Sequence, residues 1–249
     1  MKLDLDAWAE IYVAALYALA LNDFGLFRQL IHPDMLWNWW LDEVARELTK
    51  FYRDLIAGRR PILALTAPPQ HGKSWTLWDF MAWFAGKQPN LKIIFASYSD
   101  ELGTSANRYL FRTISSNNVF CKMFPDLHVG AADWAANISV IEFVRQAGSF
   151  RNTTVEGTIN GFRLDLGVID DPIKGSAEAN SKVQRDKIWE WFTKDFLSRL
   201  DQSAGLLIAM TRWQVDDPVG EWPNTSATAY ACCAIRRSPK QRIGGGEKY

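Results

Sequence analysis

A lysine and a serine near residue 73 have the types and spacing needed to hold nucleotide phosphates. They belong to residues 67–74, APPQHGKS, which follow the apolar segment 62–66 and precede a helical pattern. In this context backbone N–H groups surround phosphate oxygens, Lys73 reaches the β and γ phosphates, and Ser74 ligates magnesium. We therefore predict a phosphate loop (Walker A) for ATP and Mg²⁺. Its predicted binding residues are Pro69, Gln70, His71, Gly72, Lys73 and Ser74.

Two adjacent carboxylates follow a second apolar segment. Residues 164–169, LDLGVI, end at Asp170 and Asp171, which precede Pro172. A strand-end acid is the usual partner of a phosphate loop (Walker B), so we predict that Asp170 holds magnesium together with Ser74. Asp171 is predicted to orient or deprotonate the attacking water, although the assignment of a general base stays open. A turn or helix cap after a buried strand is the alternative.

Short apolar segments alternate with helical patterns beyond residue 60. This alternation predicts an α/β fold with a mainly parallel sheet, namely a P-loop NTPase (ASCE/RecA-like) three-layer sandwich. Residues 149–161 resemble an extended hairpin. The predicted strands are 62–66, 92–97, 138–143, 164–169 and 206–210. The predicted helices are 73–86, 101–115 and 178–200.

The chain ends differ in character from this central part. From Leu3 to about Gly58 apolar residues recur every three or four positions, which predicts helices, with Asp34 as a candidate cap and Gly58 as a stop. After residue 220 neither periodicity continues. We predict an N-terminal helical segment at 1–58, a P-loop ATPase domain at 59–221, and an irregular, flexible tail at 222–249.

Composition limits the classes of partner. The 28 basic and 28 acidic residues cancel, so DNA contact requires a local patch. The apolar run 8–21 is interrupted by Glu10 and is too short to span a bilayer, so we expect a packed helix and no membrane. Three cysteines without a repeated spacing favour a reducing compartment. We expect the twelve tryptophans to serve core packing more than base stacking. His32 and His128 show no convincing partner in the sequence.

The layout resembles terminase large subunits of tailed bacteriophages and prophages. The resemblance rests on residues 68–74, on 157–163 leading into 169–174, and on 210–213 followed by Asp216, Asp217 and Gly220. It implies an ATPase motor that couples Mg-ATP hydrolysis to translocation of double-stranded DNA into a procapsid. It also implies a homo-oligomeric ring, a portal protein, a terminase small subunit and the host bacterial cytoplasm. Thr211 matches the residue that couples nucleotide state to DNA movement.

Several positions depart from the family pattern. Gln70 and His71 stand where some terminases keep an arginine, so Arg163 and Arg212 are the candidate arginine fingers, one of them acting across a subunit boundary. A surface ion pair explains each of them equally well. Asp171 stands where many related motors have glutamate. The predicted catalytic residues are therefore Asp171, Lys73, Arg163 and Arg212.

A complete terminase large subunit resembles a two-part enzyme whose second part is a nuclease. After Gly220 only 249 − 220 = 29 residues remain, so we expect no nuclease activity and suspect a truncated prophage copy. Two rival functions remain. One is a remnant that binds nucleotide without productive turnover, and the other is a helicase-like DNA-dependent ATPase.

Overall fold

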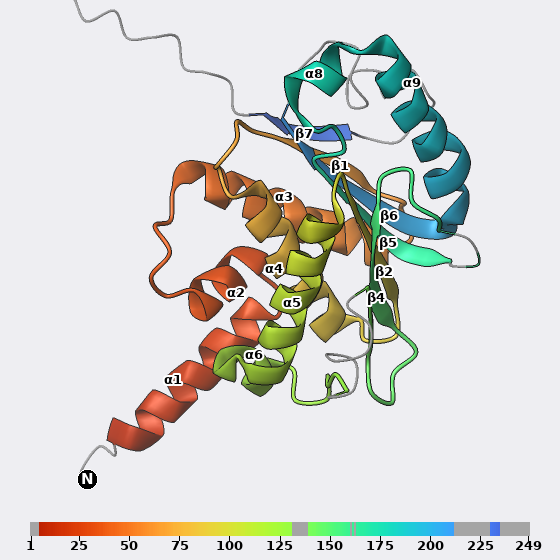
Figure 1. The fold of residues 1–249 in the computed structure, drawn as a ribbon. Coiled ribbons are helices and arrows are strands. Elements are labelled where there is room, and N and C mark those ends of the chain that lie inside the picture. The colour runs from red at the N-terminus through yellow and green to blue at the C-terminus, as the bar shows by residue number, and fades with distance from the viewer. Residues whose placement is uncertain (1–4, 131–138, 160, 162, 212–229, 235–249) are drawn as a thin grey trace, which may run out of the picture.

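The computed structural model describes residues 5–130, 139–159, 161, 163–211 and 230–234. A seven-stranded sheet in the order β3-β4-β2-β5-β6-β1-β7 lies between two layers of helices (Figure 1). All neighbouring strands are parallel except β3 and β4. The predicted α/β sandwich with a mainly parallel sheet is confirmed. The strands are β1 Ile62–Thr66, β2 Lys92–Ser97, β3 Val140–Glu142, β4 Ser149–Thr154, β5 Leu164–Asp170, β6 Leu200–Met210 and β7 Tyr230–Ala234.

The central strands are buried on both faces, which explains why they are continuous apolar runs in the sequence. Along β5, Leu166 and Val168 join the hydrophobic core on one face of the sheet, whereas Ile169 joins the core on the other face. This alternation follows from the two-residue repeat of a strand. Both layers of helices therefore pack on the same short segments.

Among the described residues, six helices lie on the first face or beside it. Among these, α2, α3, α4 and α5 share one hydrophobic core with the sheet, while α1 projects from the body (Figure 1). None of the helices among the described residues is both long and apolar enough to cross a membrane. The bounds are α1 Leu5–Ala20, α2 Phe24–Ile31, α3 Trp39–Ile56, α4 Lys73–Lys87, α5 Asp100–Ser116 and α6 Asn118–Met123.

The C-terminal end of α3 was predicted correctly from the sequence, whereas its N-terminal cap was not. Asn38, and not the predicted Asp34, caps the helix, because its side-chain oxygen accepts hydrogen bonds from the N–H groups of Trp40 and Leu41 at 3.0 and 3.1 Å. Gly58 is the predicted stop, with φ of 72° and its N–H bonded to the carbonyl of Leu55.

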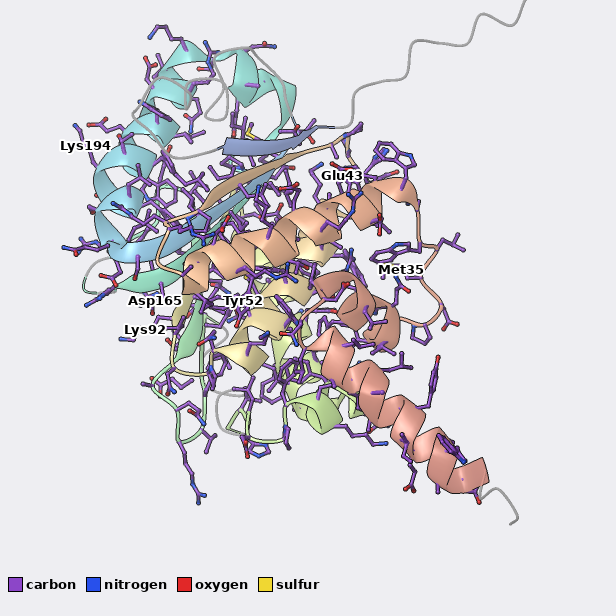
Figure 2. The ribbon with its side chains drawn as sticks, turned by 180° about the vertical axis from the view of Figure 1, so that it is seen from behind. Met35, Glu43, Tyr52, Lys92, Asp165 and Lys194 are labelled. Atoms are coloured by element: carbon purple, nitrogen blue, oxygen red, sulfur yellow. The ribbon has the colours of Figure 1, made fainter. Side chains whose placement is uncertain are left out.

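The second face is covered by a broken helical stretch. The sequence predicted one helix at 178–200, but the chain forms α8 Gly175–Asn180, α9 Lys182–Glu190, a π-helical turn Trp191–Phe196 and a 3₁₀ turn Leu197–Arg199. Ser181 separates α8 from α9 because its hydroxyl accepts the N–H of Gln184 and caps the second helix. Viewed from behind, Tyr52 of α3 and Lys194 of the π-helical turn lie on opposite sides of the sheet (Figure 2).

Two predictions about strands were wrong. Residues 149–161 do not form their own hairpin, since β4 pairs with β2 in parallel and with β3 in antiparallel orientation, and a turn follows at Glu156. The predicted irregular tail contains β7, which pairs in parallel with β1. Its five residues, YACCA, are short and lack alternation, so the sequence carried little strand signal. The rest of 222–249 lies outside the described residues.

The tryptophans divide between two environments. Trp83 is fully buried and its ring N–H donates to the carbonyl of Ala20 at 3.0 Å, as expected for a core residue. Trp8, Trp39 and Trp75 are each more than half exposed. Core packing therefore accounts for buried tryptophans such as Trp83, but it does not account for Trp8, Trp39 and Trp75, which lie at the surface.

Candidate active site

The predicted phosphate loop joins β1 to α4. Gln70 and Gly72 have φ values of 65° and 75°, so two left-handed residues turn the chain into the helix. Gly72 is the N-cap and provides no side-chain cap. The helix N-terminus therefore presents backbone N–H groups and partial positive charge, which suit an anion. Ala67 is not among the residues with positive φ, which is why a methyl group is tolerated there.

Lys73 is folded back over the loop. Its ammonium donates to the carbonyls of Ala67 and Pro68 at 2.7 and 3.0 Å and to the hydroxyl of Thr211 at 3.2 Å. Burial lowers the pKa of Lys73, while Asp171 and then Asp170 act in the opposite direction. All three hydrogen-bond acceptors are neutral, so the positive charge is free to pair with a phosphate.

Asp170 is a fully buried carboxylate at the end of β5. Neither oxygen reaches hydrogen-bonding geometry with a described residue, although Ser74 is close enough to act on its charge. Burial raises the pKa of Asp170 to about 7; Ser74 opposes this shift, Asp171 adds to it and Lys73 opposes it. A buried, unpaired carboxylate is costly, and a cation is the partner that removes the cost. The residues present therefore fit a magnesium site made by Asp170 and Ser74.

Asp171 has a left-handed backbone with φ of 48°, which for a residue other than glycine stores roughly 1–3 kcal/mol of strain. Its N–H donates to the carbonyl of Ala209 at 2.7 Å, and its carboxylate accepts the N–H of Thr211 at 3.4 Å. Burial raises the pKa of Asp171, whereas the Thr211 N–H and Lys73 lower it. The carboxylate of Asp171 is thus bonded to Thr211 and is close enough to Lys73 of the loop to interact with its charge.

Thr211 links the two predicted motifs. It follows β6, and its hydroxyl lies 3.2 Å from the Lys73 ammonium and 3.4 Å from the carbonyl of Ala67. Its N–H meets Asp171. One residue thus contacts both the phosphate loop and the strand-end acid, which is the geometry that a nucleotide sensor requires. Its coupling role stays a prediction.

A cavity of about 630 Å³ lies beside the loop, between Gln70–Gly72 and the connection from α2 to α3. The ring of His71 lies 3.0 Å from the carbonyl of Pro69 through Nδ1, and it meets Trp40 edge-on at 6.5 Å between ring centroids. Gln70, His71 and Gly72 were predicted from the sequence as binding residues, whereas the rest of the lining was not. Further lining residues are Arg28, His32, Asn38, Trp40 and Trp75.

His32 does have partners, contrary to the expectation from sequence. Its Nε2 atom lies 2.9 Å from Asp79 and 3.1 Å from the Tyr109 hydroxyl. One feature of the sequence could have identified this cluster of His32, Asp79 and Tyr109. Asp79 is the only charged residue between Lys73 and Lys87, and a lone acid in an apolar helix needs a partner.

Arg163, one of the two candidate arginine fingers, is not brought to this site. Arg163 precedes β5 at the end opposite to Asp170, about 20 Å away along the strand. It is exposed and forms an ion pair with Asp201, so it does not act in the site of its own chain. Arg212 lies outside the described residues.

The fold is similar to that of a solved phage terminase. The crystal structure of the HK97 bacteriophage large terminase matches with a TM-score of 0.51 and 14% identity over 76% of this chain and 36% of that chain. The large terminase of the thermophilic bacteriophage D6E in complex with ATP-gamma-S matches with a TM-score of 0.33 and 14% identity over 67% and 44% of the two chains. The chain thus spans less than half the length of either protein. A comparison with curated proteins found no match.

The family of the chain follows from its sequence. Residues 64–232 match the model of the terminase large subunit, T4likevirus-type, N-terminal region. The match begins within β1, includes the phosphate loop, the strand-end acids and Thr211, and extends through most of β7. Because it covers more than half of the residues, the chain belongs to the terminase large subunit family.

Proposed function

We propose that the chain is the ATPase motor of a terminase large subunit and couples Mg-ATP hydrolysis to translocation of double-stranded DNA into a procapsid. The observation that carries this proposal is the contact of Thr211 with both Lys73 and Asp171. This contact joins the phosphate loop to the acids at the end of β5. Membership of the terminase family and the fold shared with the HK97 protein support it.

Each residue of the site has a chemical task in this proposal. The N–H groups of residues 69–74 and the ammonium of Lys73 bind phosphate oxygens. Asp170 and Ser74 hold magnesium, which when bound neutralises phosphate charge and polarises the γ-phosphate. Asp171 orients the attacking water and accepts its proton. The raised pKa of Asp171 fits a proton acceptor better than the ordinary pKa of an exposed carboxylate does.

We assign the base and ribose of the nucleotide to the cavity beside the loop. Its volume of about 630 Å³ suits a ligand of this size, and residues 70–72 of the loop form one of its walls. Trp40 and Trp75 supply aromatic surface for a planar ring, and Asn38 and His32 supply polar atoms. The cavity therefore adjoins the proposed phosphate site and has room for the rest of a nucleotide.

The remaining parts of the proposal come from the family. We propose a homo-oligomeric ring that works with a portal protein and a terminase small subunit in the host bacterial cytoplasm. The exposed Arg163, at the far end of β5 from Asp170, is accessible to a neighbouring subunit. The net charge of zero makes a local basic patch, rather than the whole surface, the contact with DNA.

The test is magnesium-dependent ATP hydrolysis by the unaltered chain, by Lys73→Ala and by the matched surface variant Lys50→Ala. We expect hydrolysis to be lost only in Lys73→Ala, and to rise with double-stranded DNA and with protein concentration, because an activating arginine comes from a neighbour. Binding of ATP without turnover under all of these conditions would identify a remnant. Stimulation by single-stranded DNA together with strand separation would identify a helicase-like ATPase.

A further inference from the structure

We propose that Asp79 is a positioning residue, which holds the wall of the base cavity against the helix of the phosphate loop. In this role it sets the affinity for the base and ribose and leaves the affinity for the phosphates unchanged. The proposal rests on the proposed nucleotide site. It adds a residue that lies outside both the phosphate loop and the strand-end acids.

Asp79 is fully buried in α4, seven residues after Gly72 and thus about 10 Å further along the helix axis. Its neighbours in sequence are Trp78 and Phe80, which are also buried. A carboxylate in such a position is stable only when it is paired and hydrogen-bonded. The segment of α4 that contains Asp79 is therefore fixed by whatever bonds to this side chain.

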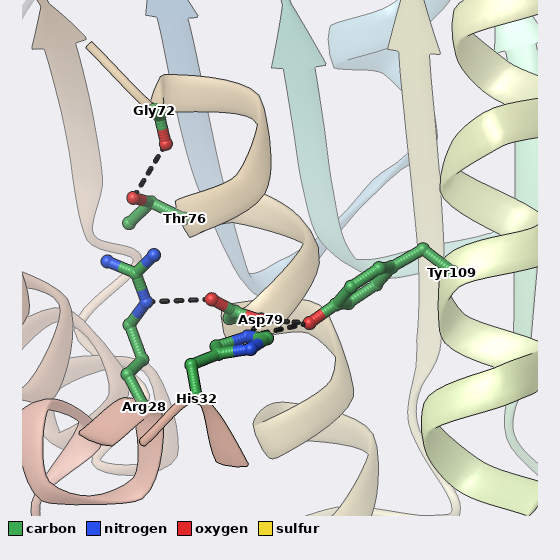
Figure 3. A network of polar contacts seen from close by, with 6 residues as sticks. All are labelled: Arg28, His32, Gly72, Thr76, Asp79 and Tyr109. Carbon is green, nitrogen blue, oxygen red and sulfur yellow. Dashed lines mark hydrogen bonds and ion pairs between the residues drawn. The ribbon is translucent and has the colours of Figure 1, made fainter. Parts of the chain in front are cut away.

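Three side chains from two other helical regions bond to Asp79 (Figure 3). Arg28 of α2 donates through Nε at 2.7 Å, and His32 at the end of α2 lies 2.9 Å away through Nε2. Tyr109 of α5 donates its hydroxyl to the same carboxylate oxygen that His32 meets. Burial, followed by the charge of Asp79, raises the pKa of Tyr109, so the hydroxyl keeps its proton and remains a donor.

Two of these partners also form the cavity. Arg28 and His32 line it, opposite the loop residues Gln70–Gly72. In Figure 3 the terminal nitrogens of Arg28 point along α4 toward Thr76 and Gly72, at the end of the helix that follows the loop. One of them, Nη1, is buried and has no hydrogen-bond partner among the described residues. This donor is unsatisfied, while Nε holds the side chain in place through Asp79.

The geometry separates the two ends of the nucleotide. Lys73, Ser74 and the loop N–H groups contact the phosphates, and none of the hydrogen bonds that Lys73 makes involves Asp79. The cavity wall from α2 meets α4 through Asp79. Loss of this carboxylate therefore releases the wall and leaves the phosphate contacts in place.

The experiment compares two ligands that share the phosphates. Binding of Mg-ATP and of Mg-tripolyphosphate is measured by titration calorimetry in the unaltered chain and in the double variant Arg28→Met with Asp79→Leu. Apolar replacements of similar size remove the buried ion pair without leaving one charge behind, so the fold is retained. We expect the affinity for ATP to fall about tenfold and that for tripolyphosphate to stay within about twofold.

Two tyrosine variants provide a graded and a matched comparison. Tyr109→Phe removes one donor to Asp79, and we expect the affinity for ATP to fall about threefold. Tyr52→Phe removes a buried hydroxyl that meets Gln88 at the other end of α4, and we expect no change in either affinity. This pair of variants keeps the test available if the double variant does not fold.

The inference is overturned if the double variant and Tyr109→Phe bind ATP as the unaltered chain does, or if both ligands lose affinity equally. Equal loss would show that Asp79 only stabilises the fold. Failure of the proposed function gives a different result. In that case the unaltered chain binds neither ligand, or Lys73→Ala binds both as well as the unaltered chain does.

Discussion

The two walls of the candidate nucleotide site are specified in different ways. The phosphate side consists of residues 67–74 with Asp170, Asp171 and Thr211. All of these except Thr211 belong to two short contiguous sequence motifs, 67–74 and 170–171. The cavity side consists of Arg28, residues 32–38 and Trp40, anchored on Asp79, and its contacts join residues 47 and 51 positions apart. Backbone geometry and charge suffice to bind phosphate, whereas a base needs a wall assembled from distant segments.

The largest expected effect concerns the phosphate side. Asp170→Asn removes the buried anion that is proposed to hold magnesium, and we expect ATP hydrolysis to fall by about 10³-fold, or about 4 kcal/mol. Steady-state hydrolysis with saturating magnesium measures the change. The matched control is Asp165→Asn at the opposite end of β5, where the carboxylate accepts the N–H of Lys92. Similar hydrolysis rates for both variants would show that Asp170 is not part of the catalytic site.

A second prediction concerns the stability of the cavity side. Asp79→Ala leaves the Arg28 guanidinium buried without its counter-charge, and we expect the free energy of unfolding to fall by about 3–5 kcal/mol. Urea unfolding followed by circular dichroism measures it. The exposed ion pair of Arg163 and Asp201 offers the contrast, because Asp201→Ala should change stability little. A small loss for Asp79→Ala would mean that this cluster does not anchor the wall.

A third prediction is a pH dependence on the phosphate side. Without bound metal, Asp170 keeps its proton in the folded chain up to a pKa of about 7, whereas in the unfolded chain it titrates near pH 4. The folded state thus holds more protons between these values, so the free energy of unfolding should fall by up to a few kcal/mol as pH rises from about 4 to 7. The raised pKa of Asp171 acts in the same direction.

Chemical unfolding in the presence of a chelator, at several pH values between 4 and 8, measures this dependence. Asp170→Asn should remove most of the slope. A stability that rises steadily over this range in the unaltered chain would mean that Asp170 is ionised in the folded state without metal.

The smallest expected effect concerns the connection that borders the cavity. Asn38 caps α3 through two N–H groups, and Asn38→Ala should lower the free energy of unfolding by about 1 kcal/mol. Asp34→Ala is the matched comparison, since Asp34 lies in the same connection and does not cap the helix. Thermal unfolding of the two variants distinguishes them. Equal losses would show that the cap contributes nothing specific.

The sequence predicted the phosphate side because its signals are local. The strands β1 and β2 were predicted with their observed bounds, and the start of α4 at Lys73 was predicted from the phosphate-loop motif that precedes a helix. The link through Thr211 needed the resemblance to a family, because Lys73 and Thr211 are 138 residues apart. Local patterns alone give no reason to pair two such residues.

The cavity side and the edge of the sheet were missed for different physical reasons. His32 looked unpartnered because both of its partners lie on other helices, 47 and 77 residues away. The strand β7 was missed because its short sequence does not alternate between apolar and polar residues. What defines it as a strand is its parallel pairing with β1, which lies far away in the sequence. The sequence suggested Asp34 as the cap, whereas Asn38 is the observed cap; both residue types cap helices well, and only the position where α3 begins decides between them.

The most direct test of the account is ATP hydrolysis by Thr211→Val beside Thr211→Ser. Valine keeps the shape but removes the hydroxyl that meets Lys73 and Ala67, whereas serine keeps that hydroxyl. The account predicts that Thr211→Val binds ATP within a few-fold of the unaltered chain and hydrolyses it at least about tenfold more slowly, while Thr211→Ser remains active. Hydrolysis by Thr211→Val at the rate of the unaltered chain would contradict the claim that this residue joins the two halves of the catalytic site.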